Sequence, residues 1–150
     1  MPKINTKSFF RTDLIGKYLD KKTYKVMNRF GAVVRLTAQR SMRYKKGASP
    51  KGTPPHAHNK DGKKALLRKL LFYQLGPNNK SVVVGPVLKD STRRLVITRL
   101  HEEGGRSTTV IRQDGKKKRV PAVYPARPTM KPAFSKNVGK VTQMYKNIKV

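Results

Sequence analysis

Apolar and small residues recur at helical spacing over the first third of the chain. After Asp20, a residue type that favours the N-cap, they follow the i, i+3, i+4, i+7 pattern of one helix face. The positions of this face are Leu19, Thr23, Val26, Met27, Phe30, Val33, Val34, Thr37 and Ser41. We therefore expect a long helix that begins at Asp20 and buries one side. The stripe expected in the core is Val26, Phe30, Val33 and Val34. Residues 1–17 have scattered apolar side chains without a regular period, which predicts an N-terminal arm.

Basic residues occupy the opposite face of this predicted helix. They are Lys21, Lys25, Arg29, Arg35 and Arg43. A run of charge on a helix is more often a solvated face than a binding surface. The high charge of the whole chain favours a contact in this case. We therefore treat this face, here called the basic ridge, as a candidate contact for DNA or an acidic partner.

Residues 45–63 have the composition of a long loop. Glycine and proline recur from Gly47 to Pro55, and Asp61-Gly62 follows. Neither a helix nor a central strand continues through such a stretch. Long loops inside a compact domain are uncommon and tend to be functional.

Short apolar segments after the loop predict a small sheet. Residues 66–71 favour a short helix that leads into an extended segment at 71–75, and the three valines before Gly85-Pro86 predict a buried strand. Residues 95–100 fit either a strand or a short helix. Asp114-Gly115 stands between two segments of strand character, 108–113 and 117–122, which is a hairpin signal. Together these segments predict a β-meander of three or four mainly antiparallel strands.

The C-terminal part predicts a rigid segment followed by a helix. Each proline in 124–128 biases its predecessor away from helix, so this stretch is expected to be extended. A helix over 130–147, weakened by Gly139, would place on one side Phe134, Val138, Val141 and Tyr145. The order of elements predicts one α+β domain over residues 1–150, with the long helix packed on the sheet.

Charge and composition then restrict the partners. Thirty-six Lys and Arg against seven Asp and Glu give a formal charge of +29, which indicates a polyanionic partner. Ribosomal, chromatin-like and viral structural proteins all fit this charge. Cysteine is absent, which excludes disulfides and thiolate metal sites. No apolar run approaches the roughly 18 residues of a membrane span, so we expect no membrane contact and use in a cytoplasm or a particle assembled there.

The residues that often carry chemistry do not form a catalytic pattern. His56 and His58 make a His-x-His pair, but no further ligand has suitable spacing for a metal. His101 is followed by Glu102 and Glu103, which point apart in regular structure, and a structural turn is expected. The glycine spacing of 47–52 is that of a phosphate-binding loop, but Thr53 stands where that motif has lysine. We therefore predict no enzyme activity, no cofactor and no metal, and any nucleic-acid contact is expected to be with phosphates.

Four segments, taken in order, resemble the head–tail joining family of tailed bacteriophages, whose members are also described as neck or tail-completion proteins. They are the loop 49–56 that ends in Pro-Pro-His, the basic-leucine segment 66–70 leading to Val-Val-Val-Gly-Pro at 82–86, the turn Leu-His-Glu-Glu-Gly-Gly at 100–105, and the Pro-Ala-Arg-Pro block in 124–134. The resemblance spans about residues 19–146. Two departures are Glu103, where the family has an aromatic residue, and the unusually basic stretch 60–64.

This resemblance implies a small α+β subunit of a homo-oligomeric ring, with six subunits as one candidate size, at the junction of phage head and tail. It implies that the partners are other neck and tail proteins and that the ring surrounds a DNA channel. It also implies that the protein is assembled in the host cytoplasm, ends up in the virion and catalyses no reaction. The candidate subunit-interface residues are Pro54, Pro55, His56, Pro125, Arg127 and Pro128. Arg127 on its stiff backbone would dock against a carboxylate or a carbonyl cluster, or else cover the core with its methylenes. The alternative function is a ribosomal or other basic RNA-binding structural protein.

Overall fold

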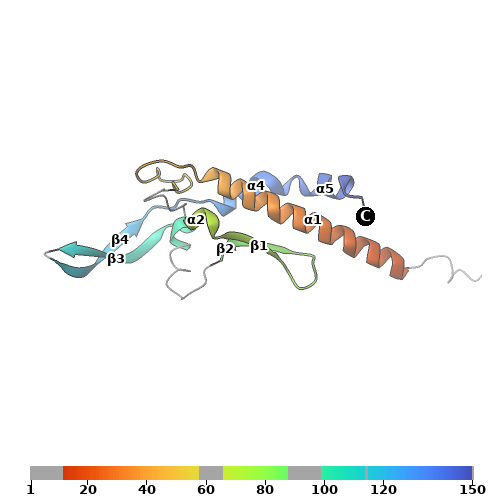
Figure 1. The fold of residues 1–150 in the computed structure, drawn as a ribbon, viewed down its shortest axis with the longest axis horizontal. Coiled ribbons are helices and arrows are strands. Elements are labelled where there is room, and N and C mark those ends of the chain that lie inside the picture. Colours follow the sequence, from red (N-terminus) through yellow and green to blue (C-terminus); the bar gives the residue numbers. More distant parts are fainter. Residues whose placement is uncertain (1–11, 58–65, 88–98, 114, 150) are drawn as a thin grey trace, which may run out of the picture.

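The computed structural model describes residues 12–57, 66–87, 99–113 and 115–149, and it is an elongated α+β molecule built along one helix (Figure 1). The elements are α1 (Thr12–Ser41), α2 (Leu66–Lys69), β1 (Leu71–Leu75), β2 (Val82–Pro86), β3 (Gly105–Gln113), β4 (Lys116–Tyr124), α4 (Met130–Val138) and α5 (Val141–Asn147). Residues 99–103 are also helical. The predicted fold class, a long N-terminal helix with small antiparallel strands and C-terminal helices, is confirmed.

Helix α1 begins earlier than the sequence pattern indicated. It starts at Thr12, so residues 12–17 belong to the helix and their assignment to an arm was wrong. Asp20 lies inside α1 and is not its N-cap; Asp13 is instead the acidic residue of the first turn, where the helix dipole favours a carboxylate. The stretch between contains two Leu and one Lys, which are good helix formers, and no proline, so the helix extends past the region with tertiary contacts. Residues 1–11 lie outside the described part of the chain.

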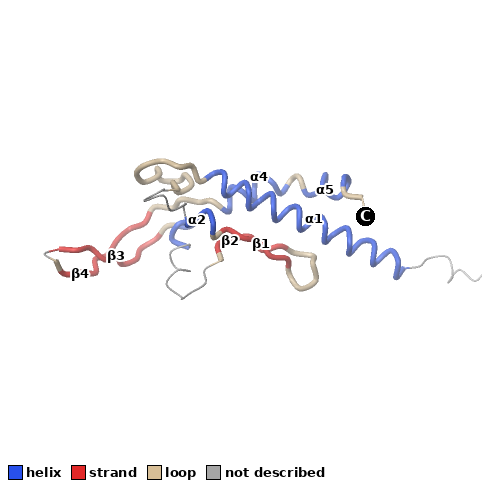
Figure 2. Tube along the Cα trace, in the orientation of Figure 1, coloured by secondary structure: helices blue, strands red, loops and turns tan. Residues whose placement is uncertain are grey.

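The core is a stripe along α1 with four-residue spacing. It consists of Val26, Phe30, Val34, Ala38 and Met42, all at most 5% exposed. Helices α4 and α5 cover one side of this stripe, and β1 and β2 cover another, as the tube view also shows (Figure 2). The predicted core stripe is confirmed, with Val33 partly buried at its edge. Leu19, expected on the same face, is 54% exposed, because α1 extends beyond both layers at its N-terminal end.

The strands form two separate hairpins and not the predicted meander. Among the described strands, β1 pairs with β2 and β3 pairs with β4, both antiparallel. The helical residues 99–103 separate β2 from β3 in sequence, so the second hairpin starts away from the first sheet. The prediction that the valine strand is buried was also wrong: Val83 is 71% exposed, because only one face of β2 packs on α1. Residues 95–98 lie outside the described ranges.

The β3–β4 hairpin projects from the end of the molecule opposite the N-terminal end of α1 (Figure 2). Its turn lies at the predicted place, with Gly115 at φ +72°, while Asp114 is outside the described residues. One face carries the half-buried residues Thr109 and Val120, and the other face is open to solvent. On the open face, Val110 and Val123 are 56% and 75% exposed.

The predicted C-terminal helix is divided in two at Gly139 and Lys140. Both parts run antiparallel to α1, since Asn137 contacts Thr37 near the end of α1 and Tyr145 contacts Thr23 nearer its start. The residues that pack inward are Ala133, Asn137 and Met144. The predicted apolar side is confirmed for Val141 and Tyr145, which are partly buried against the core, but not for Val138. Val138 is 45% exposed, and Phe134 is half-exposed with its ring edge on Phe30, at a centroid distance of 5.9 Å.

The loop predicted at 45–63 is confirmed over its described part, residues 45–57. An isolated β-bridge between Tyr44 and Ala57 joins its two ends. Residues 58–63 lie outside the described part of the chain. The short helix and the extended segment predicted at 66–75 are also confirmed as α2 and β1. Among the described residues, no helix combines the length and hydropathy that crossing a bilayer requires.

Gly31 is the point where β1 and β2 approach α1 most closely. A Cβ atom there would lie 2.6 Å from Tyr73 Cδ2 and 2.7 Å from Val82 Cγ2, whereas one at Gly16 would meet nothing within 4 Å. We expect Gly31→Ala to lower the free energy of unfolding by about 1–2 kcal/mol, since overpacking exceeds the gain in helix propensity. Gly16→Ala, the matched control, should raise it by up to ~1 kcal/mol. Denaturant unfolding followed by circular dichroism measures both, and equal stabilisation by the two changes would contradict the packing.

Candidate functional site

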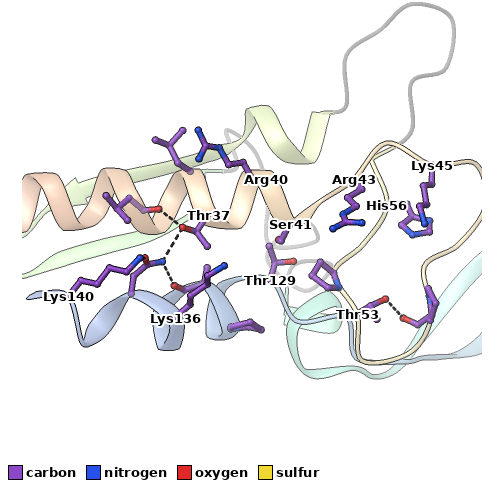
Figure 3. A pocket seen from close by; sticks show the side chains of 17 residues that line it. Thr37, Arg40, Ser41, Arg43, Lys45, Thr53, His56, Thr129, Lys136 and Lys140 are labelled. Carbon is purple, nitrogen blue, oxygen red and sulfur yellow. Dashed lines mark hydrogen bonds between the residues drawn. The ribbon is translucent and has the colours of Figure 1, made fainter.

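A groove of about 870 Å³ lies between the C-terminal end of α1, the loop of residues 45–57, here called the Gly/Pro loop, and α4 (Figure 3). Its cationic side chains come from all three walls. They are Arg40, Arg43, Lys45, Lys136 and Lys140, and we call the site they line the basic groove. All five are exposed. Within the described residues, no carboxylate lines the groove or forms an ion pair with any of the five.

The floor of the basic groove is a polar cross-link between α1 and α4. Asn137 is 1% exposed, and its Nδ2 donates to Thr37 Oγ1 at 3.0 Å and to Ala133 O at 2.8 Å. The Thr37 hydroxyl donates in turn to the carbonyl of Val33 at 2.8 Å. Lys140 Nζ donates to Asn137 Oδ1 at 3.1 Å, which sets one cation above the floor. Because buried polar atoms that are fully bonded resist displacement, this floor fixes the spacing of the two helices.

The loop wall is fastened to the Pro-Ala-Arg-Pro block. The Gly52 amide donates to Ala126 O at 2.9 Å, and Arg127 Nε donates to Ser49 O at 3.1 Å. The Arg127 amide donates to His101 O at 2.6 Å. Three segments far apart in the sequence, 49–53, 100–105 and 124–130, therefore meet in one hydrogen-bonded assembly, here called the loop junction.

Glu102 joins the loop junction to α4. Its Oε1 accepts from the amides of Thr129 and Met130 at 2.9 and 2.8 Å, and its Oε2 lies 3.1 Å from the Thr129 amide. Thr129 holds the N-cap position, but its own side chain makes no capping bond. A carboxylate supplied from another segment thus satisfies the first donors of α4, where the helix dipole also favours negative charge. Sequence reasoning expected only a structural turn at this position and missed the cap.

The glycines that follow Glu102 are required by the same junction. Gly104 has φ +74°, a region that side chains other than glycine rarely adopt. A Cβ atom at Gly104 would lie 2.8 Å from the Ala126 amide nitrogen and 2.9 Å from Tyr124 O. The helical residues 99–103 can therefore turn into β3 against the end of β4 only with glycine here.

The predicted basic ridge does not form one surface. Lys21, Lys25 and Arg29 are exposed on α1, and Lys25 Nζ donates to Lys149 O at 3.3 Å. Arg35 is used in packing, since its Nε donates to Leu71 O at 2.7 Å and its guanidinium lies 5.5 Å from the centre of the Phe72 ring. Of the five ridge residues, Arg43 alone lines the basic groove. The other four cations of the groove were not predicted, because they lie on segments that are far apart in the sequence and that no local pattern connects.

The predicted interface residues lie around the loop junction. Pro54 and His56 line the basic groove, while Pro55 is buried. Pro125, Arg127 and Pro128 are half-buried beside them. The side chain of Arg127 does bind a carbonyl, which agrees with one of the two roles predicted for it. This carbonyl, Ser49 O, belongs to the same chain. A role for these six residues in contacts between subunits stays a prediction.

The basic groove offers cations and hydrogen-bond donors. His56 Nδ1 lies 3.2 Å from Gly47 O, and His58 is outside the described residues. In the described ranges, no three His, Cys, Asp or Glu side chains group closely enough to hold a metal ion. The chemistry that this arrangement supplies is the binding of an anionic partner.

Comparisons of the chain with protein-family models, with curated proteins and with solved structures found no match.

The cap on α4 predicts a contrast between two adjacent glutamates. Glu102→Ala leaves the first amides of α4 without their acceptor, and we expect a loss of about 1–3 kcal/mol in the free energy of unfolding. Among the described residues, Glu103 pairs with Arg99 on the exposed surface, so Glu103→Ala should have little effect. Urea unfolding of both variants measures the difference, and a similar loss in the two would refute the assigned cap.

His101 predicts a pH dependence of stability. Burial, and then the charge of Arg127, lower the pKa of His101 below the ordinary value of 6.5, while Glu102 acts in the opposite sense. Because the unfolded chain then takes up the proton more readily, stability is full above that value and falls as the pH drops below it. We expect a lower melting temperature near pH 5.5 than near pH 7.5, and a smaller difference in His101→Gln. An unchanged difference in this variant would assign the effect to other groups.

Proposed function

We propose that this chain is a structural virion protein of a tailed bacteriophage, a ring-forming neck or tail-completion subunit that helps to join head and tail around the DNA channel. The observation that supports it most directly is the loop junction. Three of the segments that resemble the head–tail joining family, the Pro-Pro-His loop, the His-Glu-Glu-Gly-Gly turn and the Pro-Ala-Arg-Pro block, are bonded to one another there. Motifs that are separately weak are thus parts of one structural unit.

The distribution of exposed apolar residues also favours a ring. At one end of the molecule, the N-terminal part of α1 exposes Leu14, Ile15, Tyr18 and Leu19, each by 47–54%. At the other end, the hairpin exposes Val110 and Val123. Two different apolar surfaces at opposite ends suit a head-to-tail contact, which closes into a ring when the rotation between subunits permits.

The hairpin itself supports an intermolecular role. An isolated two-stranded hairpin is marginally stable in water, and among the described elements the main contacts of β3 and β4 are with each other. Its tip is strongly basic, with Arg112, Lys116, Lys117, Lys118 and Arg119. A neighbouring subunit that covers the valines, together with an acidic partner near the tip, would supply what the single chain lacks.

Removing the protein from its phage tests this function. We expect mature heads and mature tails that accumulate separately in negative-stain images, and joined particles when the chain is supplied from a plasmid. Joined particles at the normal yield in its absence, or co-sedimentation of the chain with ribosomal subunits, would overturn the proposal in favour of the RNA-binding alternative.

A substitution on the hairpin tests the ring contact. Val123→Asp places a carboxylate on the open face opposite Arg106, so the hairpin stays paired while its apolar contact is lost. Val83→Asp is the matched control, because Val83 is a similarly exposed strand valine on β2. At roughly 0.5 M salt, which screens repulsion between subunits, analytical ultracentrifugation should find rings for the parent and for Val83→Asp but monomers for Val123→Asp. Rings in both variants would place the contact elsewhere.

A further inference from the structure

The charge of the basic groove is poorly matched to a second copy of this chain. It gathers five cationic side chains, and within the described residues no carboxylate lines it. The whole sequence has only seven Asp and Glu, and four of the described ones are already placed: Asp20 pairs with Lys80, Glu103 pairs with Arg99, Glu102 caps α4, and Asp13 lies in the first turn of α1. A second copy therefore brings repulsion and little compensating charge.

We propose that the basic groove binds the phosphate backbone of duplex nucleic acid. This site differs from the ridge predicted on α1, and it does not depend on ring formation. Its cations come from the end of α1, the loop and α4, so they flank a channel from several sides (Figure 3). Charged side-chain tips that surround an open channel fit a polymer of regularly spaced negative charge.

The walls of the groove favour nucleic acid over an acidic peptide. Bound peptides are usually fixed by main-chain hydrogen bonds to a strand edge or by apolar anchors in a helical groove. Here the walls are two helices, whose amides are bonded internally, and a loop with prolines. Pro50, Pro54 and Pro132 line the groove and have no amide hydrogen to offer. The charged donors of the groove are the side-chain tips of Lys and Arg, which recognise phosphate without reading a sequence.

The lining also favours a duplex over a single strand. Proteins that bind single strands stack the bases on aromatic rings, and this contributes roughly 1–3 kcal/mol per base. Among the described residues that line the groove there is no Phe, Tyr or Trp. A duplex, which keeps its bases stacked on each other and presents only its backbone, needs no such platform.

The fixed floor prepares the groove for this ligand. Asn137 and Thr37 tie α4 to α1, and the loop junction holds the loop, so the walls carrying Arg43 and Lys136 are set before the ligand arrives. Long cationic side chains still move, but the backbones that carry them are held. Less ordering is therefore left for the binding step.

Two triple variants of equal charge test the assignment. The groove variant is Arg43→Gln, Lys45→Gln and Lys136→Gln; the ridge variant is Lys21→Gln, Lys25→Gln and Arg29→Gln. Each removes one arginine and two lysines, all exposed. Fluorescence anisotropy of a labelled DNA duplex of about 20 base pairs, titrated with protein over a series of salt concentrations, measures affinity and its salt slope.

We expect the groove variant to lose at least about tenfold in affinity near 0.1 M salt and to reduce the salt slope by about 2–3, since each lost phosphate contact removes roughly 0.9. The ridge variant should reduce the slope by less than about 1. Circular dichroism of both variants controls for folding.

Equal losses in the two variants would mean binding by diffuse charge and would overturn the site. Tighter binding of single-stranded DNA than of the duplex would overturn the choice of ligand, as would binding of polyglutamate with no binding of DNA. Loss of DNA binding by a groove variant that still forms rings would concern the basic groove alone and would leave the proposed neck function untouched.

Discussion

The packing of one stripe on α1 is the interaction on which every other contact depends. The stripe from Val26 to Met42 is covered by helices on one side and by a hairpin on another, and each of these two layers packs mainly on α1. The layer of β1 and β2 is seated because Gly31 has no side chain, and the layer of α4 and α5 is registered by the bond from Asn137 to Thr37. A small core of this kind leaves each layer with one main partner, so a defect in α1 loosens both.

The charge of the chain opposes this small core. With +29 on 150 residues, mutual repulsion acts on the folded state from its whole surface. The fold accommodates it by extension: α1 continues beyond the packed region, and the β3–β4 hairpin carries its cations away from the centre. An elongated shape separates like charges, but it also leaves apolar residues uncovered at both ends. Charge and shape therefore both agree with the proposal that the chain is one subunit of a larger assembly.

The sequence predicted the elements whose signals are local. The period of apolar residues on α1 identified its core stripe, and Asp114-Gly115 identified the hairpin between its two strands. The boundary at Asp20 failed because a good N-cap residue type also occurs inside helices, where nothing local distinguishes the two cases. The expected meander failed because strand character does not say which strands pair. Burial of Val83 failed for a related reason, since apolar content does not show that only one face of a strand is covered.

The residues of the candidate site were less predictable, because distant segments define them. Glu102 caps a helix that begins 28 positions later in the sequence, and Asn137 reaches Thr37 across 100 positions. Arg35 looked like a surface cation, yet the backbone of Leu71 makes it part of the packing. Three of the segments that resemble the head–tail joining family meet in the loop junction, and this junction requires glycine at position 104.

The position of the loop junction gives the hairpin a mechanical connection to the rest of the molecule. Both ends of the hairpin emerge from it: β3 follows the residues that carry Glu102, and β4 leads into the segment that ends at the capped amides of α4. A pull on the hairpin by a neighbour would therefore load the start of α4 and the Gly/Pro loop together, and these are two of the three walls of the basic groove. In the proposed ring, a force on the hairpin would therefore pass through the loop junction and change the width of the basic groove.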